Sequence, residues 1–371
     1  QHAAYLFLES LGCRWFFAGD VWEEIPRRPQ VILAPTNRLQ TPSFALRDIW
    51  PSWGLGHPQC QSDWNDWNRR NRMKGALVGS VGHAYAQIIE PRKEFKAHPE
   101  WFPLIDGQRR KAGQLCLSNP EVRHRAVEYA REAFRRDPRR IMVSLSPNDG
   151  AGWCQCAECK ALGSVSDQTL SLANHVAENI AVEFPDHYVA MYAYAGNSAP
   201  PQIAAHPQVI IFIATAFQGN RPVSELLDGW SAKARQIAIR DYYDLIIWNR
   251  DQPRWMVSSL RHQIPLYHSR NVIGITAEAG NNWAPMGLNY YVASKLMRDV
   301  TCDVDALLDD YYAHCWHAAA PALRRYDGRW RNGERMTARL LRLSFEDLEE
   351  ASAAVHDDPV ANARVDLFRL Y

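Results

Sequence analysis

Short runs of apolar and β-branched residues alternate with longer amphipathic stretches between about residues 41 and 300. This alternation predicts strands separated by helices. Helices are expected at 120–136, 168–184, 223–236 and 253–269, the first begun by Asn119 as N-cap and Pro120 in the first turn. Eight strands are expected, at 44–49, 76–80, 114–117, 141–145, 188–193, 209–213, 237–240 and 272–276.

Strand–helix alternation of this kind implies parallel strands joined by crossover helices. Eight repeats within roughly 250 residues fit an α/β fold with a closed (β/α)8 TIM barrel. The alternative is an open doubly wound sheet. It is disfavoured because the sequence has no Gly-x-Gly-x-x-Gly after the first strand and no Walker-type loop.

Both ends of the chain carry helical patterns. Residues 3–10 predict a helix already in progress, closed by Gly12, and no Met, basic leader or apolar signal region precedes it. We therefore expect a fragment that begins inside a domain, with any secretion signal outside it. Residues 331–371 show helical apolar spacing and predict the start of a C-terminal helical region.

Charge and composition exclude two classes of function. The 371 residues include 42 Lys+Arg and 41 Asp+Glu, so no basic face for nucleic acid is indicated. No run of about 18 apolar residues predicts a membrane span. With 47% hydrophobic residues the chain can bury a large core, as one barrel or two ordinary domains. The oligomeric state is left open.

Polar and aromatic residues follow the expected strands, where TIM barrels carry their active sites. Carboxylates transfer protons, amides bind hydroxyl groups, and aromatic faces pack on sugar rings, so this set is typical of a carbohydrate site. The sequence has no Gly-x-Ser-x-Gly elbow and no phosphate cradle. The expected site residues are Asp48, His83, Asn148, Asp149, Tyr194, Asp241, Glu278, Asn282 and Trp283.

Cleavage of a glycosidic bond needs two carboxyl groups that flank it. Asp149 is the expected general acid, because an apolar floor formed by 141–145 would raise the pKa of its carboxyl group. The structural alternative for Asp149 is an Asx turn. Glu278, at the end of the eighth expected strand, is the expected base or nucleophile. Its alternative is a salt bridge to Arg240.

Three further residues have two interpretations each. Asp241 could replace Glu278 in its role, or form an ion pair with Arg240 or Arg250. His83, in a Gly-flanked loop, could bind a substrate hydroxyl or carboxylate or carry a proton, or cap a helix or lie in the core. Asp48 could hold a substrate hydroxyl, or pair with the arginine before it.

Two clusters could shape the site. Cys154, Cys156 and Cys159 favour a structural zinc site with Cys116 or a histidine as fourth ligand. The alternatives are a local disulfide plus a free thiol, three reduced thiols, or a zinc hydrolase. Catalysis itself is expected to need no cofactor. The Trp residues in 50–53, with Trp64 and Trp67, could form a sugar platform or pack under a loop.

Several motifs resemble, in order along nearly the whole chain, the bacterial barrels catalogued as domain of unknown function 4838. In that family the barrel follows a small α/β domain like that of α-glucuronidases and hexosaminidases. The matching stretches are 5–16 with Glu23 and Pro26, Gly82 and His83, 98–102 with Asp106, Gly107 and Arg109, 114–116 with 119–121, 146–150 with Cys154, Cys156 and Cys159, and Asn282 and Trp283 with 287–291.

The resemblance implies a glycoside-hydrolase-like barrel over residues 41–330, in a periplasmic or extracellular protein that handles polysaccharides or glycoconjugates. Residues 1–40 would then end a truncated N-terminal α/β domain. Hexosaminidase-type enzymes carry two carboxylates after the fourth strand, whereas this chain has Asn148 and Asp149. The sequence thus predicts a glycoside hydrolase that acts on a carbohydrate. The alternative is a non-catalytic carbohydrate-binding barrel.

Overall fold

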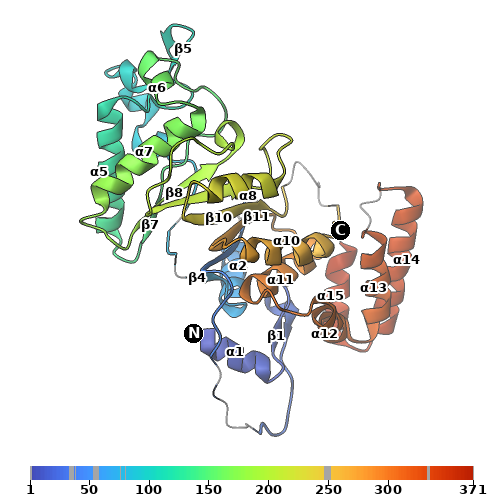
Figure 1. The fold of residues 1–371 in the computed structure, drawn as a ribbon. Coiled ribbons are helices and arrows are strands. Elements are labelled where there is room, and N and C mark those ends of the chain that lie inside the picture. Colours follow the sequence, from blue (N-terminus) through green and yellow to red (C-terminus); the bar gives the residue numbers. More distant parts are fainter. Residues whose placement is uncertain are drawn as a thin grey trace. The chain divides into compact units, whose positions relative to one another are not determined.

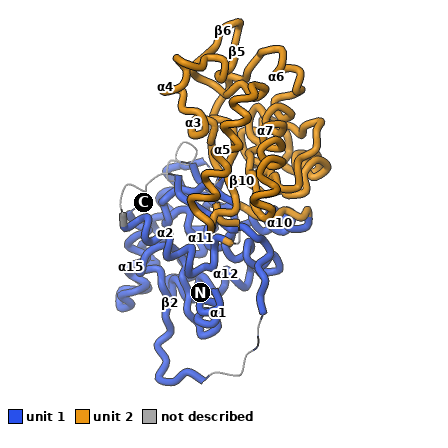
Figure 2. Tube along the Cα trace, turned by 90° about the vertical axis from the view of Figure 1, so that its left-hand side faces the viewer, with its two compact units in different colours: residues 1–74, 242–269, 276–371 blue, residues 75–241, 270–275 orange. Residues whose placement is uncertain are grey.

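The structure is a computed structural model. It describes residues 2–32, 37, 39–52, 58–75, 77–79, 81–245, 252–331 and 335–370. The chain forms two compact units (Figure 2). Unit 1 comprises residues 1–74, 242–269 and 276–371, and unit 2 comprises residues 75–241 and 270–275.

Unit 2 is built on parallel strands. Strand β7 pairs with β8, β8 with β9, and β9 with β10, all in parallel. Every residue of β9 is buried, which explains its uninterrupted apolar sequence. The elements of unit 2 are α3 (Tyr85–Ile88), α4 (Pro91–Glu94), β5 (Leu104–Ile105), β6 (Gln108–Arg109), α5 (Pro120–Arg136), β7 (Met142–Ser144), α6 (Ala157–Ala161), α7 (Val165–Ile180), β8 (Tyr188–Ala193), β9 (Val209–Ala214), α8 (Val223–Ser231) and, but for its last residue, β10 (Gln236–Tyr242).

Helices α5 and α7 pack against each other beside these strands (Figure 1). The Asn119 side chain accepts hydrogen bonds from the first turn of α5, as the sequence predicts, and Pro120 occupies that turn. Helix α7 begins with a capping box in which Ser164 and Asp167 bond reciprocally. The predicted helix at 120–136 is confirmed in full.

Unit 1 is mainly helical, and α13 and α14 lie side by side in it (Figure 1). Its central helix α11 is buried along most of its length. The elements of unit 1 are α1 (His2–Ser10), β1 (Arg14–Trp15), β2 (Glu23–Glu24), β3 (Leu46–Pro51), α2 (Pro58–Arg70), α10 (Val257–Ser269), α11 (Trp283–Arg298), α12 (Val304–Trp316), α13 (Ala320–Arg329), α14 (Ala338–Ala354) and α15 (Pro359–Arg369). Strands β4 (Lys74–Gly75) and β11 (Gly274–Ala279) contain residues of both units.

The main sheet has seven strands in the order β4-β3-β11-β10-β9-β8-β7. Six of the expected strands are confirmed within a few residues. The fold is therefore mixed α/β with a largely parallel, half-barrel sheet. A closed eight-stranded barrel is not seen among the described residues.

Two expected strands are wrong. Residues 114–117 form a loop, because their backbone bonds to other loops: Gln114 N–H donates to Gly152 O, and Cys116 N–H to Trp101 O. Within 76–80, the described residues 77–79 form only one isolated parallel bridge, between Gly79 and Met142 of β7. A second bridge, beyond this range, joins His83 to Ser146, two residues after β7. Residues 76 and 80 lie outside the described residues.

The two compact units do not coincide with the expected domains. Their division runs through the stretch 41–330, so the boundaries near residues 40 and 330 stay a prediction. The expected C-terminal helices are present as α14 and α15, and helical structure already begins with α12. Among the described residues, no helix has the length and apolar character needed to cross a membrane.

The Glu9 carboxylate holds the first helix of unit 1 to the central helix α11. It contacts Lys295 Nζ at 2.6 Å, Arg298 at 2.9 Å and Arg72 at 2.5 Å. Burial alone would raise the pKa of Glu9, but the charges of Lys295 and Arg298 outweigh burial and hold that pKa below its usual value. One carboxylate thus compensates three cations in a largely buried position.

Arg364 of α15 is fully buried in unit 1. Its guanidinium donates hydrogen bonds to the carbonyl oxygens of Val21, Glu23 and Cys315, at 2.7–2.9 Å. It also pairs with the Glu24 carboxylate at 3.3 Å. A buried guanidinium is tolerated here because its donors are satisfied in several directions.

We expect Glu9→Gln to destabilise unit 1 by about 3 kcal/mol at neutral pH, because three cations lose their carboxylate partner. The folded-state pKa of Glu9 lies below the unfolded value, so its stabilisation is complete above about pH 5 and is lost as the pH falls below about 4. Urea unfolding followed by tryptophan fluorescence at pH 7 and pH 3 measures both effects.

Glu349→Gln is the matched control, since Glu349 is exposed on α14. Equal unfolding midpoints for the two variants at pH 7 would contradict the role of Glu9. So would a Glu9→Gln deficit that is undiminished at pH 3.

Candidate active site

Three of the predicted site residues meet at the ends of strands in unit 2. The Tyr194 hydroxyl, just after β8, donates a hydrogen bond to Asp149 Oδ1 at 3.2 Å. His83 Nε2 lies 3.9 Å from the same oxygen. The His83 and Tyr194 rings contact each other with centroids 6.0 Å apart. The structure thus brings His83, Asp149 and Tyr194 together.

His83 is positioned by β7. The O–H of Ser144 donates to Gly82 O at 2.6 Å, and Ala84 N–H donates to Ser146 O at 2.9 Å. His83 Nδ1 lies 2.5 Å from Pro147 O. Because a carbonyl oxygen only accepts, we assign the ring proton to Nδ1. In neutral His83 this leaves Nε2, the atom that faces Asp149, as an acceptor.

A narrow pocket adjoins this trio. Its cavity volume is about 10 Å³, room for about one water molecule, so a sugar would lie over the mouth of the pocket rather than inside it. The lining residues are His83, Pro147, Asn148, Gly150, Trp153, Tyr192, Tyr194, Ala195, Gly196 and Asn197.

The Asp149 carboxyl lies in an open position, and its side chain is 71% exposed. The expected apolar floor is therefore wrong. Residues 141–145 of the strand are buried or half-buried, but the turn carries Asp149 away from them into solvent. Gly150 N–H donates to Asp149 Oδ1 at 2.9 Å, so the turn itself also uses this carboxylate.

The Asn148 side chain forms hydrogen bonds with backbone groups. Its Oδ1 accepts from Ala86 N–H at 2.9 Å, and its Nδ2 donates to Gly113 O at 2.9 Å. These bonds join the Asp149 turn to α3 and to the loop before α5. The prediction that Asn148 binds substrate is corrected accordingly: its amide positions the turn.

Gln114 clamps the same turn from the other side. Its Oε1 accepts from Asn148 N–H at 2.9 Å, and its Nε2 donates to Asn148 O at 2.9 Å and to Gly150 O at 3.2 Å. Gln114 is only 1% exposed. The buried carboxamide therefore replaces the regular hydrogen bonding that the turn lacks.

Asp241 lies in unit 2 and is buried. Thr215 donates a hydrogen bond to Asp241 Oδ1 at 2.6 Å, and the Arg240 guanidinium bonds to Asp241 O at 3.3 Å. The contact with Arg240 is made through the Asp241 backbone. Arg250, the other expected partner, lies outside the described residues.

Glu278 and Asp48 belong to unit 1, so neither unit alone assembles the predicted pair of Asp149 and Glu278. Glu278 is half-buried near the end of β11, and its carbonyl oxygen accepts from Tyr243 N–H at 2.8 Å. Asp48 forms an ion pair with Lys74 rather than with the adjacent arginine. The role of Glu278 in catalysis stays a prediction.

Two of the residues considered for a sugar platform, Trp64 and Trp67, lie in the core of unit 1 with Trp283, and Trp50 is half-buried. Trp64 and Trp67 are each 1% exposed, and Trp283 is 9% exposed. The Trp283 ring packs against both, at centroid distances of 4.5 and 5.0 Å. Packing rather than a sugar platform is therefore the interpretation that holds for Trp64 and Trp67, and the expectation that Trp283 lines the substrate site is wrong because its ring is buried. Trp53 lies outside the described residues.

Asn282 is the N-cap residue of α11, and its side chain makes no capping bond. It is 4% exposed, and its Oδ1 has no hydrogen-bond partner among the described residues. A buried amide oxygen cannot reach a substrate hydroxyl. The structure therefore does not support substrate binding by Asn282.

Other aromatic side chains lie beside the unit 2 trio. Trp153 and Tyr192 line the pocket, and the Phe217 ring contacts Tyr194 with centroids 5.6 Å apart. Phe217 is 45% exposed and has a positive φ of 66°. Trp153 and Tyr192 were not predicted, although Trp153 directly precedes the cysteine cluster and Tyr192 lies on a predicted strand.

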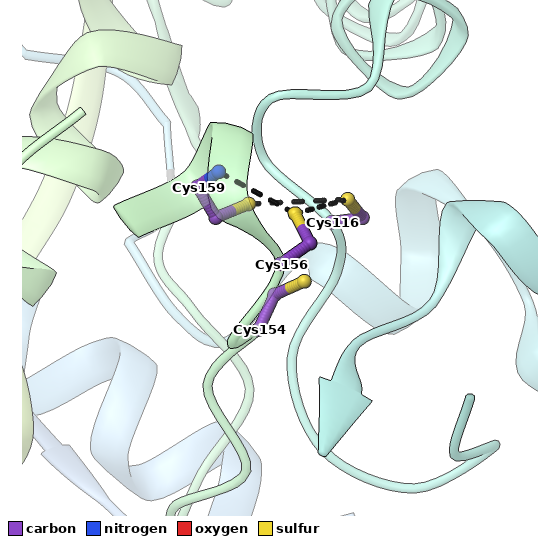
Figure 3. Close-up of side chains that lie close together, drawn as sticks. All are labelled: Cys116, Cys154, Cys156 and Cys159. Carbon is purple, nitrogen blue, oxygen red and sulfur yellow. Dashed lines mark hydrogen bonds between the residues drawn. The ribbon is translucent and has the colours of Figure 1, made fainter. Parts of the chain in front are cut away.

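Four cysteines of unit 2 converge, including the predicted fourth member. The sulfur atoms of Cys116, Cys154, Cys156 and Cys159 all lie within 4.8 Å of one another, and all four residues are buried. Figure 3 shows Cys116 approaching from one backbone segment and the other three from a second. Hydrogen bonds from the Cys154 and Cys159 thiols lower the pKa of Cys116.

The chain belongs to the family described as "Domain of unknown function (DUF4838)", whose sequence model matches residues 17–327. The family resemblance found in the sequence is thereby confirmed. No curated protein matches the chain.

Among solved structures, the chain is similar to a family 89 glycoside hydrolase from Clostridium perfringens in complex with 2-acetamido-1,2-dideoxynojirmycin. The identity is 11% and the TM-score 0.48, over 83% of this chain and 38% of that chain. The chain is also similar to a variant of CpGH89 from Clostridium perfringens in complex with its substrate GlcNAc-alpha-1,4-galactose. The identity is again 11% and the TM-score 0.48, over 84% of this chain and 38% of that chain.

The malate synthase of Haloferax volcanii, in a lead(II) complex, has 12% identity and a TM-score of 0.26, over 68% of this chain and 76% of that chain. The chain spans only 38% of the length of the two glycoside hydrolase structures. The function proposed below therefore rests on the residues of the site.

We expect Gln114→Ala to loosen the Asp149 turn, because it leaves the Asn148 N–H without its acceptor at a cost of about 1–3 kcal/mol. Hydrogen–deuterium exchange of residues 146–151 should accelerate at least about fivefold. Gln208→Ala is the matched control, since buried Gln208 donates in the same way to the carbonyl oxygens of Phe184, Pro185 and His187. Unchanged exchange at 146–151 in the Gln114 variant would refute the clamp.

Proposed function

We propose that this protein is a glycoside hydrolase, with Asp149 as general acid and Glu278 as base or nucleophile. The observation that carries the proposal is the placement of Asp149 between His83 and Tyr194, beside a small pocket with aromatic walls. Protonation of a sugar leaving group requires a positioned carboxyl group, and the neighbouring aromatic faces would pack on the sugar ring.

Asp149 would deliver a proton to the glycosidic oxygen. The Tyr194 hydroxyl and the bonded turn fix the direction of its carboxyl group. A sugar ring seated against Tyr194 and Trp153 would cover the exposed carboxyl and exclude water from it. His83 Nε2, 3.9 Å from Asp149 Oδ1, would help to orient the carboxyl group from the other side.

Glu278 completes the proposal as the second carboxyl group. It lies near the end of β11, in a sequence that continues with Gly280, Asn281 and Asn282. Ends of strands in barrel-like sheets are where catalytic carboxylates are found. Two carboxyl groups about 5 Å apart would retain the anomeric configuration, and a separation of roughly 6.5–9.5 Å would invert it.

A second candidate function is non-catalytic carbohydrate binding. The 71% exposure of Asp149 favours it, because the catalytic acids of glycosidases usually lie in apolar pockets. The pocket with its aromatic walls would serve a binding protein equally well. The two functions differ in whether the bound glycan is cleaved.

Cleavage of chromogenic uronides, hexosaminides, hexosides and sialosides, with product analysis, tests the proposal. We expect Asp149→Asn and Glu278→Gln each to lower kcat by roughly 10²–10⁴-fold, as loss of an acid or base does. Asp186→Asn, an exposed residue before β8, is the matched control and should keep full activity.

Cleavage at an undiminished rate in either active-site variant would refute the assignment of that residue. A protein that binds a glycan from the same panel, and cleaves none, would establish the binding function instead. Equal glycan affinity in wild type and both variants would show that a loss of rate is chemical rather than structural.

A further inference from the structure

We propose that Cys116, Cys154, Cys156 and Cys159 bind one zinc ion in a closed, structural site. The four sulfur atoms lie within 4.8 Å of one another in unit 2. No other group of three or more His, Cys, Asp or Glu residues with this geometry is found in the part of the chain that the structure describes. The proposal is independent of the glycosidase assignment.

The sulfur separations match one tetrahedral metal ion. A Zn–S bond of about 2.3 Å places two thiolates of a tetrahedron about 3.8 Å apart. Cys116 Sγ lies 3.7 Å from Cys156 Sγ and 3.8 Å from Cys159 Sγ. An iron–sulfur cubane would need wider spacing, because each thiolate would then bind a different iron atom. Four thiolates around one centre favour zinc.

Neighbouring donors point at the sulfur atoms, as thiolates require. Leu104 N–H donates to Cys154 Sγ at 3.3 Å, and Cys159 N–H to Cys156 Sγ at 3.4 Å. The Ser118 hydroxyl lies 3.2 Å from Cys159 Sγ. Such contacts orient metal-binding thiolates and stabilise their charge. Arg109 supplies a cation that interacts electrostatically with Cys116, Cys154 and Cys156.

The ion would join segments that otherwise have little regular structure. Cys116 lies in the loop before α5, Cys154 and Cys156 follow the Asp149 turn, and Cys159 lies in the short helix α6. Leu104, in the β5–β6 hairpin, packs on the cluster. Four thiolates leave no coordination position open for water, so this zinc would hold the loop rather than activate a nucleophile.

Elemental analysis of the full chain, purified under reducing conditions and dialysed, tests the site. We expect one zinc per chain, released when a mercurial reagent titrates the thiols. Replacement by Co²⁺ should give the sulfur-to-metal charge-transfer bands and the intense visible bands of a tetrahedral thiolate site. These measurements need no variant and do not depend on activity.

Cys159→Ser should lower the zinc content at least about tenfold and accelerate exchange at residues 146–156. Cys315→Ser is the matched control, because Cys315 is equally buried but lies in α12 of unit 1. It should keep one zinc per chain. Full zinc content in Cys159→Ser would overturn the proposal. So would a folded wild type with four free thiols, two disulfides among the four cysteines, or stoichiometric iron.

Discussion

The loop between β7 and α6 takes its conformation from hydrogen bonds to other segments, above all to 113–116. This loop has almost no regular secondary structure, and that segment supplies the Gln114 backbone bond to Gly152, the Gly113 carbonyl that accepts from Asn148, and the buried Gln114 carboxamide. The loop carries Asp149 at its start and two cysteines at its end. The carboxyl group proposed as the acid and the four buried sulfur atoms are therefore both held through this segment. Any shift of that segment would move both.

In the candidate active site, the backbone of the Asp149 turn is firmly hydrogen-bonded although the Asp149 side chain is not buried. Catalytic carboxyl groups usually sit in apolar pockets, which tune them but also cost stability. Asp149 is instead exposed, while the backbone on which it stands is tightly bonded. The chemistry of the site then depends on what the ligand covers. An exposed acid suits both a hydrolase whose bound glycan covers it and a protein that only binds the glycan.

Patterns in the sequence predicted the buried strands and helix caps well. The run at 188–193 coincides with β8, because a parallel strand that is buried on both faces is a short continuous apolar run between polar turns. The run at 114–117 misled, since Leu115 and Leu117 are as buried as strand residues but belong to a packed loop. Asp149 and Tyr194, expected after two confirmed strands, lie together with His83, although the strand expected before His83 does not form among the described residues. The sequence could not show that the Asn148 amide already bonds to backbone groups. Nor could it show that Trp64, Trp67 and Trp283 pack on one another, because both arrangements depend on contacts between residues far apart in the sequence.

The contacts of the buried Arg364 show that the stretch matched by the family model is shorter than the part of the chain that packs as unit 1. The family model ends at residue 327, yet this guanidinium reaches back to Val21 and Glu23 near the start of the match. Glu9 lies before the match and contacts α11 within it. A shorter expression clone cut at the limits of the family would lose both side chains and leave carbonyl groups and cations without partners. The boundaries of sequence similarity are thus poor guides for cutting this protein, and the helices outside them are structural parts of unit 1.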